Sequence, residues 1–524
     1  MQSTLYTGGT ILTMEPQLCA QALLVEDGKI LCLGRADELA ALRPHARRVD
    51  LEGRTLMPGF IDAHSHFTAY ASTLGLCDLS KAESFDEILA LLGTYRASVR
   101  APKGALITGF GYDHNHLLEK RHPDKRVLAA LGEDNPVVIA HASGHMGVLN
   151  APAMRMLNLR DDMPDPEGGK MGRMEDGSLS GYMEETAFTS LKLPGPSKEQ
   201  LSRQMELAQA KYFSYGITTC QDGLTRKADW DLLQNMAQGG HLDIDLVSYI
   251  DIAQCADLAS AHPEYRKYQN HLRIGGYKLI LDGSPQGRTA WIKTFYQGQP
   301  GYSGYPVYED GVVEGYIARA LSEDMQILIH CNGDAAAEQM ITCYERALNG
   351  RYKDARPVMI HAQLVNRSQL GHMGRLGIMA SFFVAHTYYW GDVHIQNFGP
   401  RRAAQISPVQ WAMESGVNYT FHQDAPVLPP DMIDTVRRAV ERRTLSGEVL
   451  GEDQRITALQ ALYGVTRNAA YQYFEENEKG TLKPGKRADL VILSDNPLTC
   501  SPEKMGYIEV LETIKDGMSV YSKP

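Results

Sequence analysis

The sequence predicts an α/β protein built on a (β/α)8 TIM barrel, with a small β-sandwich made from both chain ends. Three observations support this prediction. The central region alternates short apolar runs with amphipathic segments, the pattern of βα units and a parallel sheet. Seven or eight such units are present, which fits a barrel better than an open sheet. Both chain ends are rich in short apolar runs and turn residues, and neither end can bury two faces by itself.

The two chain ends are expected to form one β-sandwich from residues 1–57 and 475–524. Residues 22–25 and 29–33 flank an Asp-Gly turn, which is a strong hairpin signal between apolar runs. Further short strands of the first segment are predicted at 10–13 and 47–51. The last segment supplies a buried strand that ends at Leu493 and two more strands joined through Asp516-Gly517.

Residues 58–474 are expected to form the barrel. Pro58-Gly59 marks its start, and the first strand is predicted to end in His64 and His66. Later strands are predicted at 216–220, 274–281, 326–330, 357–361, 377–382 and 417–421, with helices such as 335–348 between them. The stretch from about 70 to 210 is too long for one βα unit, so we expect an inserted subdomain over the barrel mouth.

Composition excludes several classes of function. The 524 residues contain 52 Lys and Arg against 63 Asp and Glu, a net charge of −11, and no basic run that would suit a nucleic acid. No segment resembles a signal peptide, and no apolar run approaches the ~20 residues that span a bilayer. The eight cysteines are scattered without Cys-x-x-Cys spacing, which is typical of reduced thiols in a cytoplasmic protein.

Polar residues recur where predicted barrel strands end, and a barrel enzyme places its chemistry there. Side chains two apart on a strand share a face, so a His-x-His pair can converge on one ion. Each residue alone has an ordinary alternative: a surface histidine, a turn-forming aspartate, or a lysine whose stem lies over apolar surface. Together they make a set of ligands for Zn²⁺ or a similar ion, namely His64, His66, Lys278, His330, His361 and Asp424.

Nearly end to end, the chain resembles the amidohydrolase superfamily of metal-dependent hydrolases, and within it the branch that includes N-substituted formamide deformylase-like proteins. The matching stretches are 58–66, Tyr112-Asp113-His114, Ser143-Gly144-His145, 181–185, 282–290, 330–334, 423–427 and 485–490. The resemblance implies a (β/α)8 barrel, a β-sandwich from both termini, and one or two divalent metals, usually zinc.

The resemblance also implies roles for the six candidate ligands. His64 and His66 would bind the more buried metal together with Asp424, and His330 and His361 would bind the second. Lys278 would bridge the two ions as a carboxylated lysine, because a buried amine beside cations favours its neutral form, which can add CO₂. Asp424 would act as general base and then as general acid.

Substrate contacts are less well defined. Tyr112, His145, Arg288 and His386 are candidate substrate-binding residues, and each is equally compatible with a structural role. Glu185 is a further candidate carboxylate near the metals. The aromatic segment 385–394 would overhang the barrel mouth and suits a flat or apolar group, or else packs in the core. It differs from the shorter segment of formamide hydrolases, which makes a formamide less favoured as substrate.

Three functions follow from these observations. The leading one is hydrolysis of a small, non-peptide amide C–N bond in an N-acyl or N-formyl amine or a cyclic amide. The second is a mononuclear deaminase of the same superfamily, although neither His330 nor His361 is followed at two to four residues by the Glu usual there. The third is a non-catalytic regulatory relative, which the full set of ligands disfavours. The partner is a small molecule, and a homodimer is an assembly to test.

Overall fold

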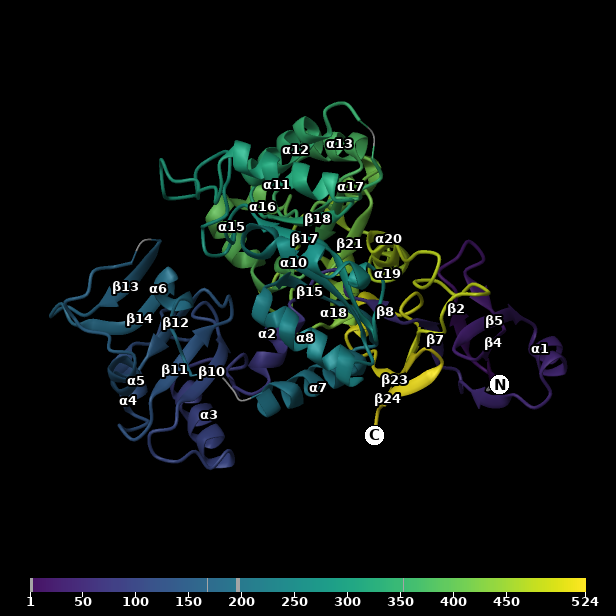
Figure 1. Cartoon of the computed structure of the whole chain (residues 1–524), viewed down its shortest axis with the longest axis horizontal. Helices are drawn as coiled ribbons and strands as arrows, with labels where there is room; N and C mark the ends of the chain where they lie inside the picture. Colours follow the sequence, from purple (N-terminus) through teal and green to yellow (C-terminus); the bar gives the residue numbers. More distant parts are fainter. Residues whose placement is uncertain (1–2, 167, 195–197, 352) are drawn as a thin grey trace. The chain divides into compact units, whose positions relative to one another are not determined.

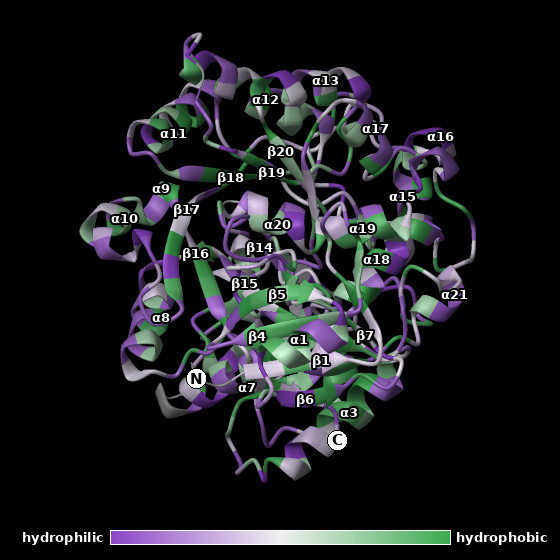
Figure 2. Ribbon diagram, turned by 90° about the vertical axis from the view of Figure 1, so that its right-hand side faces the viewer, coloured by the Kyte–Doolittle hydropathy of each residue, from purple (hydrophilic) through white to green (hydrophobic). Residues whose placement is uncertain are grey.

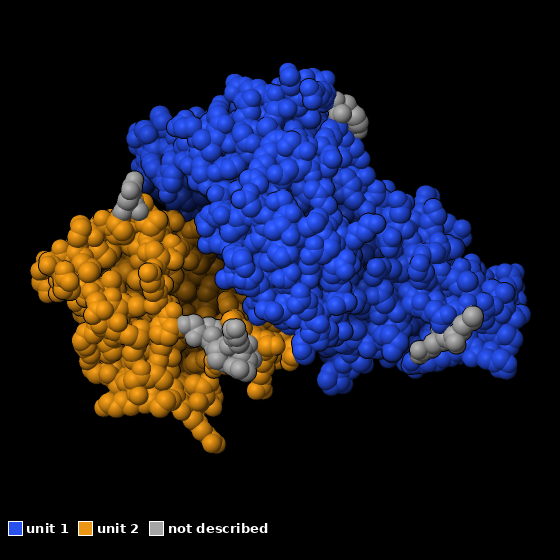
Figure 3. Space-filling model, viewed as in Figure 1, with its two compact units in different colours: residues 1–67, 209–524 blue, residues 68–208 orange. Residues whose placement is uncertain are grey.

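The structure, a computed structural model, describes residues 3–166, 168–194, 198–351 and 353–524. The chain divides into two compact units, which are described separately (Figure 3). Unit 1 comprises residues 1–67 and 209–524, and unit 2 comprises residues 68–208. Unit 1 thus contains both ends of the chain and the predicted barrel.

The centre of unit 1 is a curled sheet in which each strand is parallel to the next along the chain. Its strands are β8 (Phe60–Ile61), β15 (Ile217–Thr225), β16 (Asp245–Asp251), β17 (Leu272–Ile280), β18 (Gln326–Cys331), β19 (Val358–His361), β20 (Met379–Phe382) and β21 (Tyr419–Phe421). Helices between them include α8 (Lys227–Gly239), α11 (Asp310–Ser322), α12 (Asp334–Leu348) and α13 (Arg367–Leu376), and α18 (Met432–Glu441) follows the last strand. This is the predicted TIM-barrel-like α/β fold.

The first strand is shorter than predicted. β8 ends at Ile61, and His64 and His66 lie beyond it, where the backbone bends. The prediction that the two histidines lie on one face of this strand is therefore wrong, because neither belongs to it. After Ile61 the backbone hydrogen bonds go to different neighbours: Asp62 N–H donates to Thr219 and His66 N–H to Ala425. The segment that carries the two histidines is therefore hydrogen-bonded to β15 and to the segment that follows β21.

Both chain ends contribute to two further sheets of unit 1. One has the order β5-β4-β1-β6, from β1 (Ser3–Thr7), β4 (Ala22–Glu26), β5 (Lys29–Gly34) and β6 (Arg47–Asp50). The other has the order β24-β23-β22-β7-β2-β3, from β2 (Thr10–Leu12), β3 (Cys19–Ala20), β7 (Thr55–Pro58), β22 (Leu490–Leu493), β23 (Val510–Lys515) and β24 (Met518–Ser522). Strands from the start and the end of the chain thus share one sheet (Figure 1).

A single hydrophobic cluster joins these two sheets. Leu23 and Val25 of β4 and Leu56 and Ile492 of the other sheet belong to it. Figure 2 shows the hydrophobic residues along β4. That the two sheets form the predicted β-sandwich stays a prediction.

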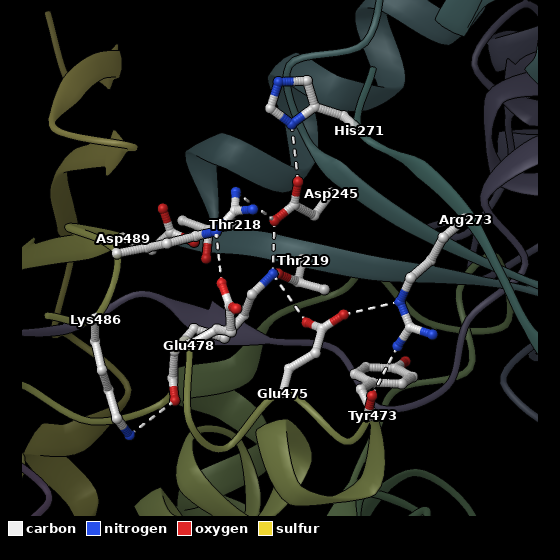
Figure 4. Close-up of polar contacts among 12 residues, drawn as sticks. Thr218, Thr219, Asp245, His271, Arg273, Tyr473, Glu475, Glu478, Lys486 and Asp489 are labelled. Carbon is white, nitrogen blue, oxygen red and sulfur yellow. Dashed lines mark hydrogen bonds and ion pairs between the residues drawn. The ribbon is translucent and has the colours of Figure 1, made fainter. Parts of the chain in front are cut away.

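A buried network of charges joins the barrel strands to the segment before β22 and to the end of β23 (Figure 4). Asp245, at the start of β16, accepts a hydrogen bond from Nζ of Lys479 at 2.6 Å, and Lys515 lies 3.1 Å from the same carboxylate. Lys479 also lies 2.9 Å from Glu475, to which Arg273 of β17 donates at 2.8 Å. Each buried charge therefore has opposite charges beside it, which burial requires.

Unit 2 has its own sheet and core. Its sheet has the order β13-β14-β12-β11-β10-β9, with β9 (Cys77–Asp78) and β11 (Val137–His141) parallel to β10 (Ile107–Tyr112) on either side of it. β12 (Met146–Leu149), β13 (Gly169–Arg173) and β14 (Leu179–Glu185) continue it with antiparallel pairing. Apolar residues of α3 (Phe85–Ser98) and of β10 to β12 form one cluster. The position of this unit over the barrel mouth stays a prediction.

No helix in the described ranges is long and apolar enough to cross a membrane. All eight cysteines are free thiols.

Candidate metal centre

Three predicted ligands converge where barrel strands end. His361 is the last residue of β19, Asp424 follows β21, and His64 follows β8. One ligand atom from each lies within 4.8 Å of the other two, and all three side chains are buried. Parallel strands present their carboxyl ends at one edge of the sheet, so residues far apart in sequence meet there.

Asp424 is the common neighbour of three histidines. Its Oδ1 lies 3.4 Å from Nε2 of His64 and 3.4 Å from Nε2 of His66, and its Oδ2 lies 3.9 Å from Nε2 of His361. Oδ1 is buried and has no hydrogen-bond partner within the described ranges. Ligands at 2.0–2.1 Å around a tetrahedral Zn²⁺ lie about 3.3–3.4 Å apart. The donor types and their spacing therefore fit a divalent ion such as Zn²⁺.

Lys278 lies inside the same cluster. Its side chain is fully buried in β17, and Nζ is 3.1 Å from Nε2 of His64. Burial lowers the pKa of this amine to about 7, although the negative charge of Asp424 opposes the shift. No carboxylate of the described residues forms an ion pair with Lys278. A neutral amine is thus accessible here near neutral pH.

His330 stands beside His361 at the end of β18. The two ring centroids are 4.6 Å apart, with the rings nearly perpendicular. Nδ1 of His330 lies 3.1 Å from Oδ1 of Asp282. The Asp282 carboxylate also accepts backbone N–H groups of Asn332, Gly333 and Trp291, at 2.7–3.0 Å. One buried carboxylate therefore orients His330 and organises the turn that follows it.

Three residues that hold the histidines were not predicted. Oε1 of Gln221 lies 2.5 Å from Nδ1 of His64, and Nε2 of His422 lies 3.1 Å from Nδ1 of His361. Asp282 is the third. Such outer contacts set the orientation and tautomer of metal-binding histidines. The signal in the sequence was their place: Gln221 follows a predicted strand, and His422 lies two residues before Asp424.

Burial controls the protonation of the cluster. It lowers the pKa of His64 and of His361 well below the usual value, so both imidazoles are neutral at pH 7. For Asp424, burial raises the pKa, but the close approach of His66 and of the other histidines outweighs burial and holds the pKa well below 3.8. Neutral imidazole and carboxylate are the forms that bind metal ions.

The backbone at the cluster is unusual. His361 has φ = 71° and Asp424 has φ = 55°, values that side-chain-bearing residues seldom adopt. Such conformations concentrate at functional sites. Gly223 of β15 lies so close to the cluster that a Cβ there would be 2.6 Å from Cε1 of His64.

The other candidate residues of unit 1 are held by neighbouring side chains. Nε of Arg288 donates to Asn397 at 2.8 Å. His386 is buried, with Nδ1 3.1 Å from Nε2 of His394 and its ring against Phe383. Among the contacts of the described residues, neither side chain hydrogen-bonds to the ligand cluster.

The remaining candidates belong to unit 2. Tyr112 is fully buried there, and its hydroxyl lies 3.0 Å from Nδ1 of His122. His145 is exposed and pairs with Glu185 at 3.0 Å. The structure therefore shows the contacts of these three side chains within unit 2, and their part in substrate binding stays a prediction.

Known proteins similar to this chain indicate its family. A protein-family model described as the amidohydrolase family matches residues 47–521. The chain is 26% identical to N-substituted formamide deformylase of Arthrobacter pascens, over 96% of this chain and 95% of that protein. It is 25% identical to the putative amidohydrolase YtcJ of Bacillus subtilis, over 99% of both.

Solved structures show the same fold. An uncharacterized metal-dependent hydrolase from Pyrococcus horikoshii matches with a TM-score of 0.78 and 24% identity, over 96% of this chain and 99% of that one. A similar protein from Pyrococcus furiosus matches with a TM-score of 0.75 and 23% identity, over 95% and 100%. With the family model matching most of its length, this chain belongs to the amidohydrolase family and resembles its N-substituted formamide deformylase-like branch.

Proposed function

We propose that this protein is a metal-dependent hydrolase that cleaves a small, non-peptide amide C–N bond, as in an N-acyl amine, an N-formyl amine or a cyclic amide. The observation that carries the proposal is the approach of His64, His66 and His361 to one buried carboxylate, Asp424. Family membership supports the hydrolase class, and the deformylase relative supports the amide substrate.

We assign His64, His66 and Asp424 to a first divalent ion and His330 and His361 to a second. Zn²⁺ suits imidazole and carboxylate donors. Bound divalent ions lower the pKa of water towards neutrality and polarise a carbonyl oxygen. The chain itself supplies the neutral histidines and the carboxylate that is proposed to move the proton.

Lys278 is proposed to be carboxylated. The lone pair of its neutral amine forms an N–C bond to CO₂, one proton leaves the nitrogen, and the product is a carbamate anion. The buried position of Nζ, 3.1 Å from Nε2 of His64, supports this proposal. Two carbamate oxygens can then serve two cations at once.

Asp424 is proposed to be the proton carrier. Its carboxylate is ionised, because its pKa lies well below 3.8. It can take a proton from the attacking water and return that proton to the leaving nitrogen. Arg288 and His386 of unit 1 are proposed to orient the substrate, a role in which hydrogen-bond donors stabilise developing negative charge. Tyr112 and His145 of unit 2 are proposed as further substrate-binding residues, and Glu185 of the same unit as a further functional carboxylate.

A mononuclear deaminase is the second candidate. One observation favours a single ion: His64, His361 and Asp424 form a compact ligand group within the described ranges, and His330 is not part of that group. Counting metal ions per chain separates the two functions, because the hydrolase requires close to two.

We place the protein in the cytoplasm, in keeping with its eight free cysteines.

The test is a substrate screen with metal-loaded protein. N-acyl and N-formyl amines, cyclic amides and dipeptides are incubated with it, and release of the amine is measured. We expect turnover of at least one non-peptide amide and loss of that activity after chelation. A protein with one ion per chain that releases ammonia from a nucleobase would support the deaminase instead.

A further inference from the structure

Unit 2 contains a second group of metal-ligand side chains, which the proposed hydrolysis does not use. β10 and β11 are parallel neighbours, and Tyr112 at the end of β10 pairs with His141 at the end of β11. Asp113 and His114 follow β10 directly. The carboxyl ends of the two strands therefore bring Asp113, His114 and His141 to one edge of this sheet.

The three ligand atoms form a small triangle. Nε2 of His141 lies 3.3 Å from Nδ1 of His114 and 3.4 Å from Oδ1 of Asp113. Nδ1 of His114 lies 3.7 Å from the same carboxylate oxygen. Ligands around a tetrahedral Zn²⁺ are about 3.3–3.4 Å apart, so each side of the triangle is close to that spacing.

Neighbouring groups orient each ligand. The backbone and side-chain N–H groups of Asn115 donate to Oδ1 of Asp113 at 2.8 and 2.9 Å. The hydroxyl of Ser143 lies 3.0 Å from Nδ1 of His141, where it can accept the N–H of a histidine that binds through Nε2. The ring of His122 lies over that of His114, with centroids 4.0 Å apart.

Burial makes this group unlike a surface cluster. Asp113 and His141 are each 5% exposed, and Tyr112 beside them is fully buried. Buried carboxylates and imidazoles in contact are usually paired, hydrogen-bonded or bound to an ion. Two nitrogens and one oxygen suit zinc and its neighbours in the first transition series.

We propose that Asp113, His114 and His141 of unit 2 form a binding site for Zn²⁺ or a similar divalent metal ion. None of the three belongs to the ligand cluster of the barrel. Three protein ligands leave one coordination position for water or a ligand atom. The competing arrangement is a hydrogen-bonded cluster without an ion, in which Nε2–H of His141 donates to Asp113 or His114. The backbone N–H of Ser143, 3.0 Å from Nδ1 of His141, favours that tautomer.

The experiment locates and counts the ions in the full chain. Protein stripped with a chelator is reloaded with Zn²⁺ and crystallised, and an anomalous difference map is calculated at the zinc edge. We expect a peak between Asp113, His114 and His141, in addition to density in the barrel. A map with barrel peaks and nothing at this triangle overturns the inference while leaving the proposed function intact.

Matched variants test the same site in solution. His141→Gln and His114→Asn should each lower the zinc content by close to one ion per chain and weaken Zn²⁺ binding at this site at least tenfold, measured by equilibrium dialysis and mass spectrometry. His114 is half-buried, so its replacement perturbs folding least. The control is His372→Asn, which removes a half-buried histidine that pairs with Glu345 at 3.3 Å. If His372→Asn lowers the zinc content as much as the other two, or if those two retain it, the site is refuted.

Discussion

Asp424 is where the histidines of the barrel cluster meet, and its ionised carboxylate has two tasks in the proposed reaction: holding an ion and carrying a proton. An amide in its place keeps an oxygen for the ion and cannot carry the proton. The two tasks can therefore be separated by one substitution.

Asp424→Asn should lower kcat by at least about 100-fold, the usual contribution of a positioned general base, while most of the metal stays bound. Turnover of the best substrate from the screen and metal content by mass spectrometry check this expectation together. Full activity in the variant would contradict the role of Asp424. Loss of both metal and activity would show that ligation is its main role.

Lys278 predicts a dependence of stability on pH in the metal-free protein. The folded amine has a pKa of about 7, against 10.5 when exposed. Between these values the unfolded chain binds the additional proton, so stability rises with pH, by up to about 1.4 kcal/mol per pH unit from this group. The burial cost is complete below pH 7 and vanishes towards pH 10.5.

Lys278→Met removes this cost, so its stability advantage over the parent should be largest near pH 6.5 and smaller at pH 9. Urea unfolding of chelator-treated proteins in CO₂-free buffer at several pH values measures the difference. Parallel stability curves for the two proteins would show that Lys278 keeps its ordinary pKa.

At the scale of single residues, the sequence indicated the candidate metal ligands but not the side chains that hydrogen-bond to them. Strand-end positions identify His330, His361 and Asp424 because the chemistry of a barrel collects there. Gln221 and His422 act through contacts between strands far apart in sequence, so their positions along the chain do not by themselves reveal which histidine each one contacts.

Among the elements, β15 lies against the cluster of candidate metal ligands at a glycine, Gly223. A Cβ at Gly223 would lie 2.6 Å from Cε1 of His64 and 2.8 Å from the carbonyl oxygen of Ser65, closer than real Cβ contacts. The strand and the histidine loop must then move apart.

Gly223→Ala should therefore displace His64 and weaken metal binding about tenfold or more, as loss of a supporting contact does. Gly315→Ala is the matched control, because Gly315 lies exposed in α11 and a Cβ there meets nothing within 4 Å. It should leave metal binding unchanged and be neutral or stabilising by up to about 1 kcal/mol. Equal metal affinity in both variants would contradict the close approach.

The strands were predictable to different degrees. Apolar runs such as that of β18 were found within a residue or so, but β16 was not predicted. Asp245, Ser248 and Asp251 interrupt its apolar pattern, yet all seven residues of β16 are buried. Each polar side chain has a partner supplied by the fold: Lys479 for Asp245, Thr225 for Ser248, and the N–H groups that begin α9 (Ile252–Cys255) for Asp251.

For unit 1 as a whole, the buried charges around Asp245 join the barrel to the chain's last segments. Lys479 is at the centre, in contact with both Asp245 and Glu475. Removing one member of a buried network leaves the opposite charges uncompensated.

Lys479→Met should lower the free energy of unfolding by about 3–5 kcal/mol, measured by urea denaturation. Lys523→Met removes the same kind of side chain from an exposed pair with Glu509 and should cost less than about 1 kcal/mol. A small effect of Lys479→Met, similar to that of the control, would show that Arg273 and Lys515 compensate its loss.

The sheet that contains strands from both chain ends affects how the protein folds during its synthesis on the ribosome. β7 pairs with β22, and roughly 430 residues separate the two strands. A ribosome adding about 5–20 residues per second needs about 20–90 s to complete that interval. During this time one edge of β7 stays open, and open strand edges pair readily with other chains. Chains truncated before Leu490 should therefore accumulate in the insoluble fraction, although every ligand candidate has already been synthesised.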